Sequence, residues 1–482
     1  MVYQYISFVL GLVFSILYYA STAIDSIPLL IPILVVSFFI LLYYINGYRN
    51  EYSVYSNWIR PSNLLLVGLI VVNFQTFANV ALNLASISDY LNTSLYSGYV
   101  GKVFFLSSSC LLGIMAGLST KPHIFMFKTS AEPVIEKEVK FWSILSFVLL
   151  CAFIVNIDIN SFLTGLDYEG SGASDRIIKK SSYFEQLLNC SVVVVLALQS
   201  RRLAQSNEPV ELKTFLASYS PMFKLTIFVY ILLRLLSGDR GPVIYTICAI
   251  VFSYWIISRK KVSFIKFASF VLCAAICVTA LGIVRGLDKE LSFADRVADA
   301  QGIMSKNELR SVCKPTQELA NSVNCNFIAV HDINEGVTSY KYGAYNFIAL
   351  IGSIPGSSFV LSKVFGVNLH DYMSSEYLTI SYFGKNYPFG LGTTAVADFY
   401  LDFGALVSFL LFFFCGVIYK KIDYMYTIQP LRKASIPMII FIIKISSIAI
   451  YTSRFSFAGT MASALYIIII YYVIHKLLFC IR

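Results

Sequence analysis

The chain has 482 residues, of which 57% are hydrophobic and 13% are charged, and its formal net charge is +10. This is far more apolar side chain than a soluble domain of that size buries, and its mean hydropathy is +0.71. The composition excludes an ordinary soluble protein and predicts an all-α polytopic integral membrane protein. The basic residues are spread thinly over many segments instead of forming one stripe, which argues against nucleic acid as a partner.

Apolar segments long enough to cross a bilayer recur along the chain, and a helix needs roughly 20 residues to do so. We expect about twelve transmembrane helices, the first of them a retained span, because no basic region precedes it. They divide the chain into a nine-span region at 1–284, a large loop region at 285–393 and a three-span region at 394–482. The expected spans are 3–22, 28–47, 62–82, 100–118, 141–157, 182–200, 222–237, 241–258, 263–284, 394–418, 435–452 and 456–476.

The distribution of Lys and Arg between alternate loops predicts the orientation, because basic residues near span ends resist translocation. With the N-terminus inside, most of the basic residues fall on the cytoplasmic side. The short loops on the other side carry few, apart from a cluster at 176–180. Both termini are therefore expected to be cytoplasmic, and the region 285–393 external.

The external region is expected to contain short helices. Residues 287–298 have helical apolar spacing, which fits either a helix on the bilayer surface or a helix packed on its own domain. Residues 345–366 are apolar, but Gly352, Pro355 and Gly356 interrupt them, so this stretch is either re-entrant beside a cavity or wholly outside. Cys313 and Cys325 lie in the same external region, and we expect them to form a disulfide.

Ionisable residues inside apolar spans are costly and usually have a partner or face a water-filled cavity. Asp398 and Asp402 are spaced i, i+4 and share one face of the span 394–418. Lys444 lies at a depth similar to that of Asp402 in the following span. We expect an ion pair between Asp402 and Lys444 with a structural role, and a catalytic role is the alternative.

Four arginines lie at the predicted outer ends of spans, namely Arg234, Arg240, Arg285 and Arg454. Arg240 lies in a tight Gly-Asp-Arg-Gly-Pro turn close to Arg234. Guanidinium groups repel one another unless they share an anion, and their planar geometry suits phosphate oxygens. We expect an anion site here, and the alternative is that Arg234 pairs with Asp239 or Asp398.

Candidate proton acceptors lie in the external region. His331 and His370 each precede an aspartate, which raises the basicity of an imidazole, and Glu335 and Glu376 are competing bases. Ordinary surface histidines are the alternative. The sequence has no phosphate-binding loop, nucleophile elbow or Cys/His metal motif, so no metal and no cofactor is expected.

The segment Gly390-Leu391-Gly392-Thr393-Thr394, followed after five residues by Phe399-Tyr400-Leu401-Asp402-Phe403-Gly404, resembles the O-antigen and oligosaccharide repeat-unit polymerases of the Wzy family. The segments Ser375-Glu376-Tyr377-Leu378, Gly238-Asp239-Arg240-Gly241-Pro242 and Arg285-Gly286 are also similar.

The resemblance implies a GT-C-like membrane glycosyltransferase in the bacterial cytoplasmic (inner) membrane. Such an enzyme transfers a glycan from polyprenyl pyrophosphate to a lipid-linked repeat unit, with a repeat-unit flippase and a chain-length regulator as partners. An O-antigen ligase of the same fold type and a repeat-unit flippase are the alternatives. A transporter is usually built from internal repeats, and we see none here.

Overall fold

The computed structural model describes residues 2–21, 30–84, 98–121, 134, 136–157, 180–205, 210–237, 240–258, 260–286, 316–366, 368–384, 390–427 and 434–479. Regular secondary structure in these ranges is entirely helical. This agrees with the expected all-α class.

Each of the twelve expected spans falls on a helix. Among the described residues, nine helices are long and apolar enough to cross a membrane. The exceptions are α11, which has 16 residues, α21, which has 13, and α13, whose apolar described part is also short. The structure therefore supports a polytopic membrane protein. The twelve helices are α1 (Val2–Ala20), α2 (Leu30–Asn50), α4 (Pro61–Ala81), α5 (Val100–Leu118), α6 (Glu136–Val155), α9 (Lys180–Leu203), α11 (Pro221–Leu236), α12 (Arg240–Ser258), α13 (Phe264–Gly286), α20 (Ala395–Thr427), α21 (Ile436–Ile448) and α22 (Phe457–Phe479).

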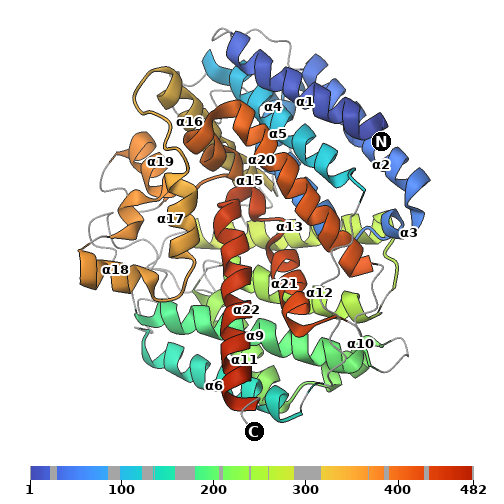
Figure 1. The fold of residues 1–482 in the computed structure, drawn as a ribbon, viewed down its shortest axis with the longest axis vertical. Helices are drawn as coiled ribbons and strands as arrows, with labels where there is room; N and C mark the ends of the chain where they lie inside the picture. The colour runs from blue at the N-terminus through green and yellow to red at the C-terminus, as the bar shows by residue number, and fades with distance from the viewer. Residues whose placement is uncertain are drawn as a thin grey trace.

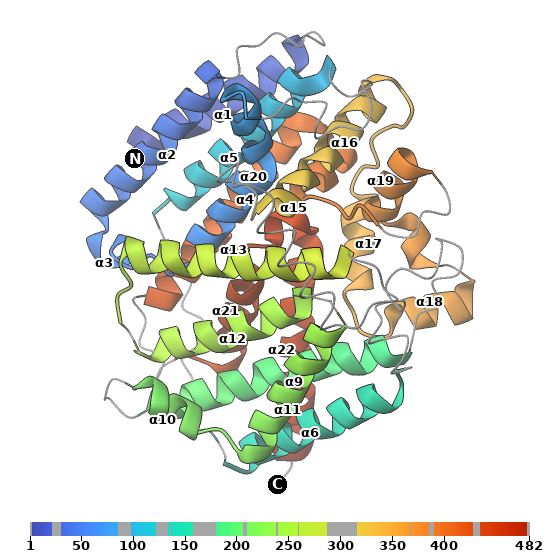
Figure 2. The same ribbon diagram turned by 180° about the vertical axis from the view of Figure 1, so that it is seen from behind.

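The long helices form two groups, which Figures 1 and 2 show from opposite sides. In the first group, α5 packs along both α1 and α20, with α2 and α4 beside them. In the second group, α9 packs against α6, α12 and α21, and α21 also packs against α22. We call these the α5 group and the α9 group. Short helices α3 (Tyr52–Tyr55), α10 (Leu212–Ala217) and η7 (Thr452–Arg454) lie in connections.

Glycines bring α5 and α20 into backbone contact. A Cβ atom at Gly117 would lie 2.1 Å from the carbonyl oxygen of Phe413, and one at Gly416 would lie 2.3 Å from that of Ile114. Only residues without a side chain permit this approach, which is a common way of packing helices in membranes. The interface therefore leaves no room for a side chain at these positions.

A break at Gly404, where φ is +77°, divides α20 into a short arm before it and a long arm after it. Such a positive φ favours glycine and interrupts the helical hydrogen bonds. The backbone N–H groups of Lys341 and Tyr342 donate to the carbonyls of Leu401 and Asp402, each at 2.9 Å. The break thus holds the segment leading into α17, and Asp398 and Asp402 both lie on the short arm.

The described part of the region between α13 and α20 consists of short helices, as expected. They are α15 (Gln317–Ala320), η4 (Asn321–Val323), α16 (Asn324–Asn334), α17 (Ala344–Gly352), α18 (Ser357–Phe365), η5 (Leu369–Tyr372) and α19 (Ser374–Phe383). The helix expected at 287–298 lies outside the described residues. Helix α16 is almost wholly buried against α5 and α20, so this region is partly built into the helical bundle.

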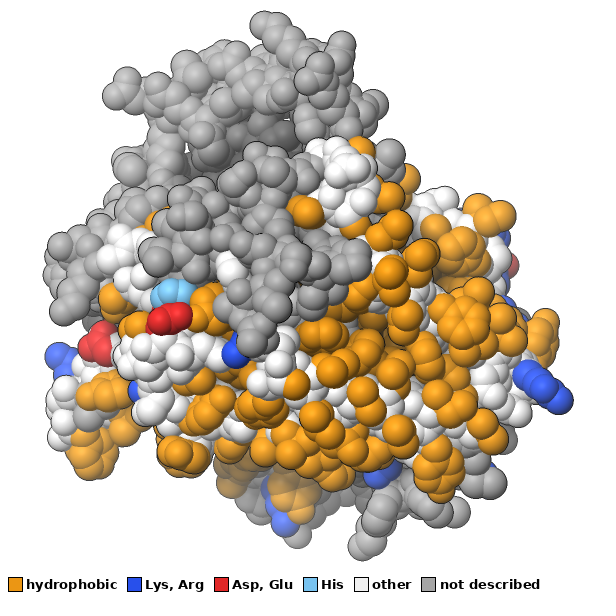
Figure 3. Space-filling model, turned by 90° about the horizontal axis from the view of Figure 1, so that it is seen from above, with side chains coloured by type: hydrophobic (Ala, Val, Ile, Leu, Met, Phe, Trp, Pro, Cys, Tyr) orange, Lys and Arg blue, Asp and Glu red, His pale blue; other side chains and the backbone are white. Residues whose placement is uncertain are grey.

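Large apolar side chains are exposed along the outer faces of α1 and α2, for example Val9 at 56% and Phe38 at 56%. Seen from above, the molecule has a broad surface on which hydrophobic side chains predominate, with Lys and Arg near its edges (Figure 3). Such a large apolar surface is unfavourable in water and fits contact with lipid.

Candidate functional site

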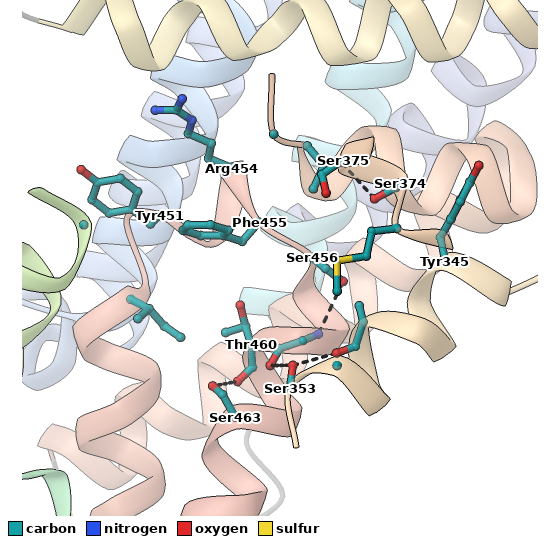
Figure 4. A pocket seen from close by; sticks show the side chains of 18 of the residues that line it. Tyr345, Ser353, Ser374, Ser375, Tyr451, Arg454, Phe455, Ser456, Thr460 and Ser463 are labelled. Atoms are coloured by element: carbon teal, nitrogen blue, oxygen red, sulfur yellow. Dashed lines mark hydrogen bonds between the residues drawn. The ribbon is translucent and has the colours of Figure 1, made fainter. Parts of the chain in front are cut away.

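A cavity of about 580 Å³ lies where α12, α17, α21, η7 and α22 meet the segment 390–393. Tyr451 and Arg454 lie on one side of it, and Tyr345 and Ser353 lie on the other (Figure 4). Its volume is in the range of small-molecule sites. The lining residues are Gly241, Tyr245, Tyr345, Ala349, Gly352, Ser353, Met373, Ser374, Ser375, Gly390, Leu391, Gly392, Thr393, Lys444, Ile448, Tyr451, Arg454, Phe455, Ser456, Gly459, Thr460 and Ser463.

One wall of the cavity is built on the buried carboxylate of Asp398, which is 2% exposed. The Ser374 hydroxyl donates to Asp398 Oδ1 at 2.6 Å, and the Thr393 hydroxyl donates to the same oxygen. Both hydroxyls belong to lining residues, so the carboxylate lies directly behind the polar surface. Asp398 thereby links α20 to α19 and to the segment before α20.

Two cationic side chains line the cavity, Lys444 from α21 and Arg454 from η7. Burial next to Asp402 and Asp398 raises the pKa of Tyr345 to about 12, so this phenol remains a neutral hydrogen-bond donor at physiological pH. The cavity thus combines positive charge, hydroxyl donors and aromatic faces, which are the groups that bind anions and sugars.

A side cavity of about 190 Å³ lies between α9, α12 and α21. It shares Tyr245 and Lys444 with the main cavity, so the two adjoin. The remaining lining residues are Glu185, Gln186, Asn189, Val192, Val193, Pro242, Thr246, Ala249 and Ser447. Lys444 therefore lies between the two cavities.

The expected ion pair between Asp402 and Lys444 is not formed. Asp402 instead accepts hydrogen bonds from the backbone N–H groups of Tyr345 and Asn346, at 3.1 and 2.9 Å, and from the Asn346 side chain at 2.6 Å. The carboxylate therefore caps the first turn of α17, where unpaired N–H groups favour an anion. Equal depth in two spans did not place the two charges face to face.

Arg234 pairs with Glu185 and not with Asp398, and the other alternative partner, Asp239, lies outside the described residues. Its Nε donates to Glu185 Oε1 at 2.7 Å, and the Tyr230 hydroxyl donates to the same oxygen at 2.7 Å. The guanidinium also lies over the ring of Phe153, 5.4 Å from its centroid. Its charge is thus compensated beside the side cavity, and the structure does not place Arg234 in the main one.

The other two expected arginines lie on described helices, but their side chains lie outside the described residues. Arg240 is the first residue of α12, and the next residue, Gly241, lines the main cavity. Arg285 is the penultimate residue of α13. Of the four arginines, the structure places the side chain of Arg454 in the cavity.

The candidate bases that the structure describes are not among the cavity-lining residues. His331 Nδ1 lies 2.9 Å from Asp332 Oδ1, and Asp332 also accepts hydrogen bonds from Tyr377 at 2.7 Å and Ser381 at 2.5 Å.

The other candidate bases lie on neighbouring segments. The carboxylate of Glu335 accepts a hydrogen bond from the Tyr99 hydroxyl. Glu376 is buried on α19 and follows the lining residue Ser375, and the His370 side chain lies outside the described residues.

The expected disulfide is not seen at Cys325, which is a free, buried thiol on α16. Its Sγ lies 3.7 Å from the carbonyl oxygen of Gly392, so it points into the interface with the segment before α20. Burial raises the pKa of Cys325 to about 12, which keeps the thiol protonated. Cys313 lies outside the described residues.

The sequence reasoning missed Glu185, although it lies inside the expected span 182–200 and the rule for ionisable residues in spans points to it. It also missed Ser374 and Tyr451, whose residue types carry no signal apart from their neighbours in space. Comparisons with family models, with curated proteins and with solved structures find no match to this chain.

Proposed function

We propose that the protein is a membrane glycosyltransferase that polymerises polyprenyl-pyrophosphate-linked oligosaccharide repeat units into O-antigen or capsular polysaccharide. The observation that supports this most directly is the main cavity, which combines Lys444 and Arg454 with serine and threonine hydroxyls and tyrosine rings. A pyrophosphate leaving group requires fixed cations, and sugars require hydroxyl partners and aromatic faces. The first four residues of the segment 390–404 that resembles the Wzy family, Gly390 to Thr393, line the same cavity.

In this reaction, a hydroxyl of the acceptor sugar attacks the anomeric carbon of the donor glycan. The bond from that carbon to the pyrophosphate oxygen breaks, and the electron pair leaves with the pyrophosphate. Arg454 and Lys444 stabilise the negative charge that grows there. Arg240 and Arg285 are further candidates for this role, because Arg240 precedes the lining residue Gly241 and Arg285 lies near the end of α13.

The hydroxyl proton needs an acceptor. Asp398 is the carboxylate hydrogen-bonded to the cavity hydroxyls of Ser374 and Thr393, so we assign it the proton, passed on through Ser374. His370, His331, Glu335 and Glu376 would act instead if the external region moved over the cavity when substrate binds.

The proposal places the reaction on the outer face of the bacterial cytoplasmic membrane, with both termini inside. A flippase would supply the repeat units, and a chain-length regulator would set the product size. A ligase of the same fold type would use the same cations but a different acceptor. A flippase would instead bind the repeat unit and move it without breaking a bond.

The test is to analyse the surface glycan of cells whose own copy is replaced by Arg454→Ala, with membrane abundance measured in parallel. A matched control is Arg202→Ala, because Arg202 is an exposed arginine in the last turn of α9 and does not line the cavity. We expect Arg454→Ala to lose about 100-fold or more of the polymer, the usual cost of removing one such donor, and to leave single repeat units on the surface.

Other outcomes separate the alternatives. Long lipid-linked chains that never reach their acceptor would indicate a ligase, and repeat units held inside the cell would indicate a flippase. Asp398→Asn keeps a hydrogen-bond acceptor for Ser374 but removes the basic group, so it should also abolish polymer while the protein still folds. Normal polymer in the Arg454 variant at normal abundance would contradict the proposed anion site.

A further inference from the structure

Helices α17 and α18 are joined by a short turn, with α18 lying across α17 (Figure 2), and this pair, here called the hairpin, has an apolar exposed side. Along α17, Phe347 is 61% exposed, Leu350 40% and Ile354, just past its end, 51%. In α18, Val360 is 50% exposed and Val364 68%. The exposed residues of α17 recur at three- to four-residue intervals and form one stripe. Water would be an unfavourable environment for this surface.

The opposite side of α17 faces the protein. Tyr345, Ala349, Gly352 and Ser353 line the main cavity, and the Ser353 hydroxyl donates to the carbonyl of Gly459 at 3.1 Å. Gly459 lies in the first turn of α22, one of the nine helices that can cross a membrane. The hairpin therefore leans on the end of a membrane helix, and α17 separates the cavity from the surroundings.

Each helix of the hairpin has nine residues, or about 14 Å of length, which is about half of the hydrocarbon thickness. Each helix is long enough to reach into a single leaflet, but neither can cross the bilayer. Exposed Lys363 lies near the end of α18, where a long stem lets its charge reach the headgroups.

Hydrogen bonds within the turn between the helices pair several of its polar groups. The N–H groups of Ile354 and Ser357 donate to the carbonyls of Ile351 and Ile354, at 2.9 and 3.1 Å. The Ser357 hydroxyl donates to the Ile351 carbonyl at 2.7 Å, and Pro355 has no N–H group to satisfy. Non-helical backbone at membrane depth persists where its polar groups are paired, and these bonds pair part of the turn.

We propose that the α17–α18 hairpin is inserted into the hydrocarbon of one leaflet, where it forms the wall between the main cavity and lipid. The occupant of its exposed face is the bilayer, because the side chains of that face are apolar and the hairpin packs through its other side on the end of a membrane helix. A lipid-linked substrate could then place its headgroup in the cavity while its tail stays in the bilayer. The insertion itself does not depend on the reaction proposed above.

The experiment uses nitroxide labels on single cysteines in the full chain, reconstituted into phosphatidylcholine and phosphatidylglycerol vesicles. The labelled positions are Phe347 and Val364, and the matched control is Val337, which is 64% exposed but lies in the connection after α16. Parent protein labelled in parallel gives the background from the native cysteines. Collision with dissolved oxygen is compared with collision with a water-soluble nickel chelate.

We expect oxygen to collide more often than nickel at 347 and 364, and the opposite order at 337. Nickel-dominated collision at 347 and 364 would overturn the proposal. Because a label could displace the hairpin, the unmodified protein is also treated with a carbene-generating photoprobe dissolved in the bilayer. Carbene adducts on residues 344–366 comparable to those on exposed α1 residues support insertion, and adducts no more frequent than at Val337 refute it.

Discussion

Helix α20 takes part in the α5–α20 interface and also supports the main cavity through Asp398, yet these two regions are built in opposite ways. In the interface, glycines bring two backbones together, and 89% of the residues in the most apolar stretch of α5 are buried. At the cavity, the short arm of α20 is held from its neighbours by polar side chains, with Asp398 behind a layer of hydroxyls. The same helix is thus a rigid support after its break and a scaffold for polar groups before it.

The α5–α20 interface is closely packed, whereas the region before Gly404 leaves a cavity. In lipid, the hydrophobic effect does not drive helices together. Small residues instead allow the backbones to approach, and the helices gain van der Waals contact. Charged and hydroxyl residues require partners, and partners require room for side chains and substrate. The break at Gly404 separates the polar short arm of α20 from the long arm that packs on α5.

The largest effect is expected from glycine substitutions that compare the two regions. Gly117→Ala places a Cβ 2.1 Å from a backbone oxygen, whereas the nearest atom to a Cβ at Gly390, on the cavity wall, is 3.7 Å away. We expect the first to cost about 3 kcal/mol of stability, because backbone must shift, and the second about 0.5 kcal/mol or less. Thermal unfolding in detergent measures both, and equal stability would show that the interface is looser than described.

A smaller effect is expected at Asp402, which supports the cavity wall through α17. Asp402→Ala should cost about 2 kcal/mol, because it leaves the first N–H groups of α17 without their acceptor. Its coupling to Lys444→Met in a double-mutant cycle should stay below about 0.5 kcal/mol, since the two side chains do not pair. A coupling of about 3 kcal/mol or more would restore the buried ion pair between them.

The smallest expected effect is chemical rather than energetic, and it concerns Cys325. Burial raises the pKa of Cys325 from the ordinary value of 9.0 to about 12, so the folded protein holds the neutral thiol. The stability that this protonation contributes is fully present below pH 9 and is lost as the pH rises toward 12. Alkylation at pH 8 should therefore spare Cys325 in the native protein and modify it after denaturation without reductant. A requirement for reductant, read by mass spectrometry of its peptide, would reinstate the disulfide with Cys313.

Much of the fold was predictable because hydropathy is a local property. Every expected span coincides with a helix, and the interruption at Gly352, Pro355 and Gly356 marked the hairpin turn correctly. The short helices of the region after α13 were also expected. For these features, the physical cause lies in consecutive residues, and no knowledge of neighbours in space is needed.

The partners of the charged residues were decided by tertiary structure alone. Asp402 and Lys444 have matching depths in sequence, but rotation about the helix axes sends one to the start of α17 and the other to the cavities. Arg234 meets Glu185 because α11 and α9 both pack around α6, which brings together residues 49 positions apart. The sequence by itself determined that this chain belongs in lipid and where its helices run. Which side chains share a cavity depends on how those helices rotate and break, and packing across the whole chain sets both.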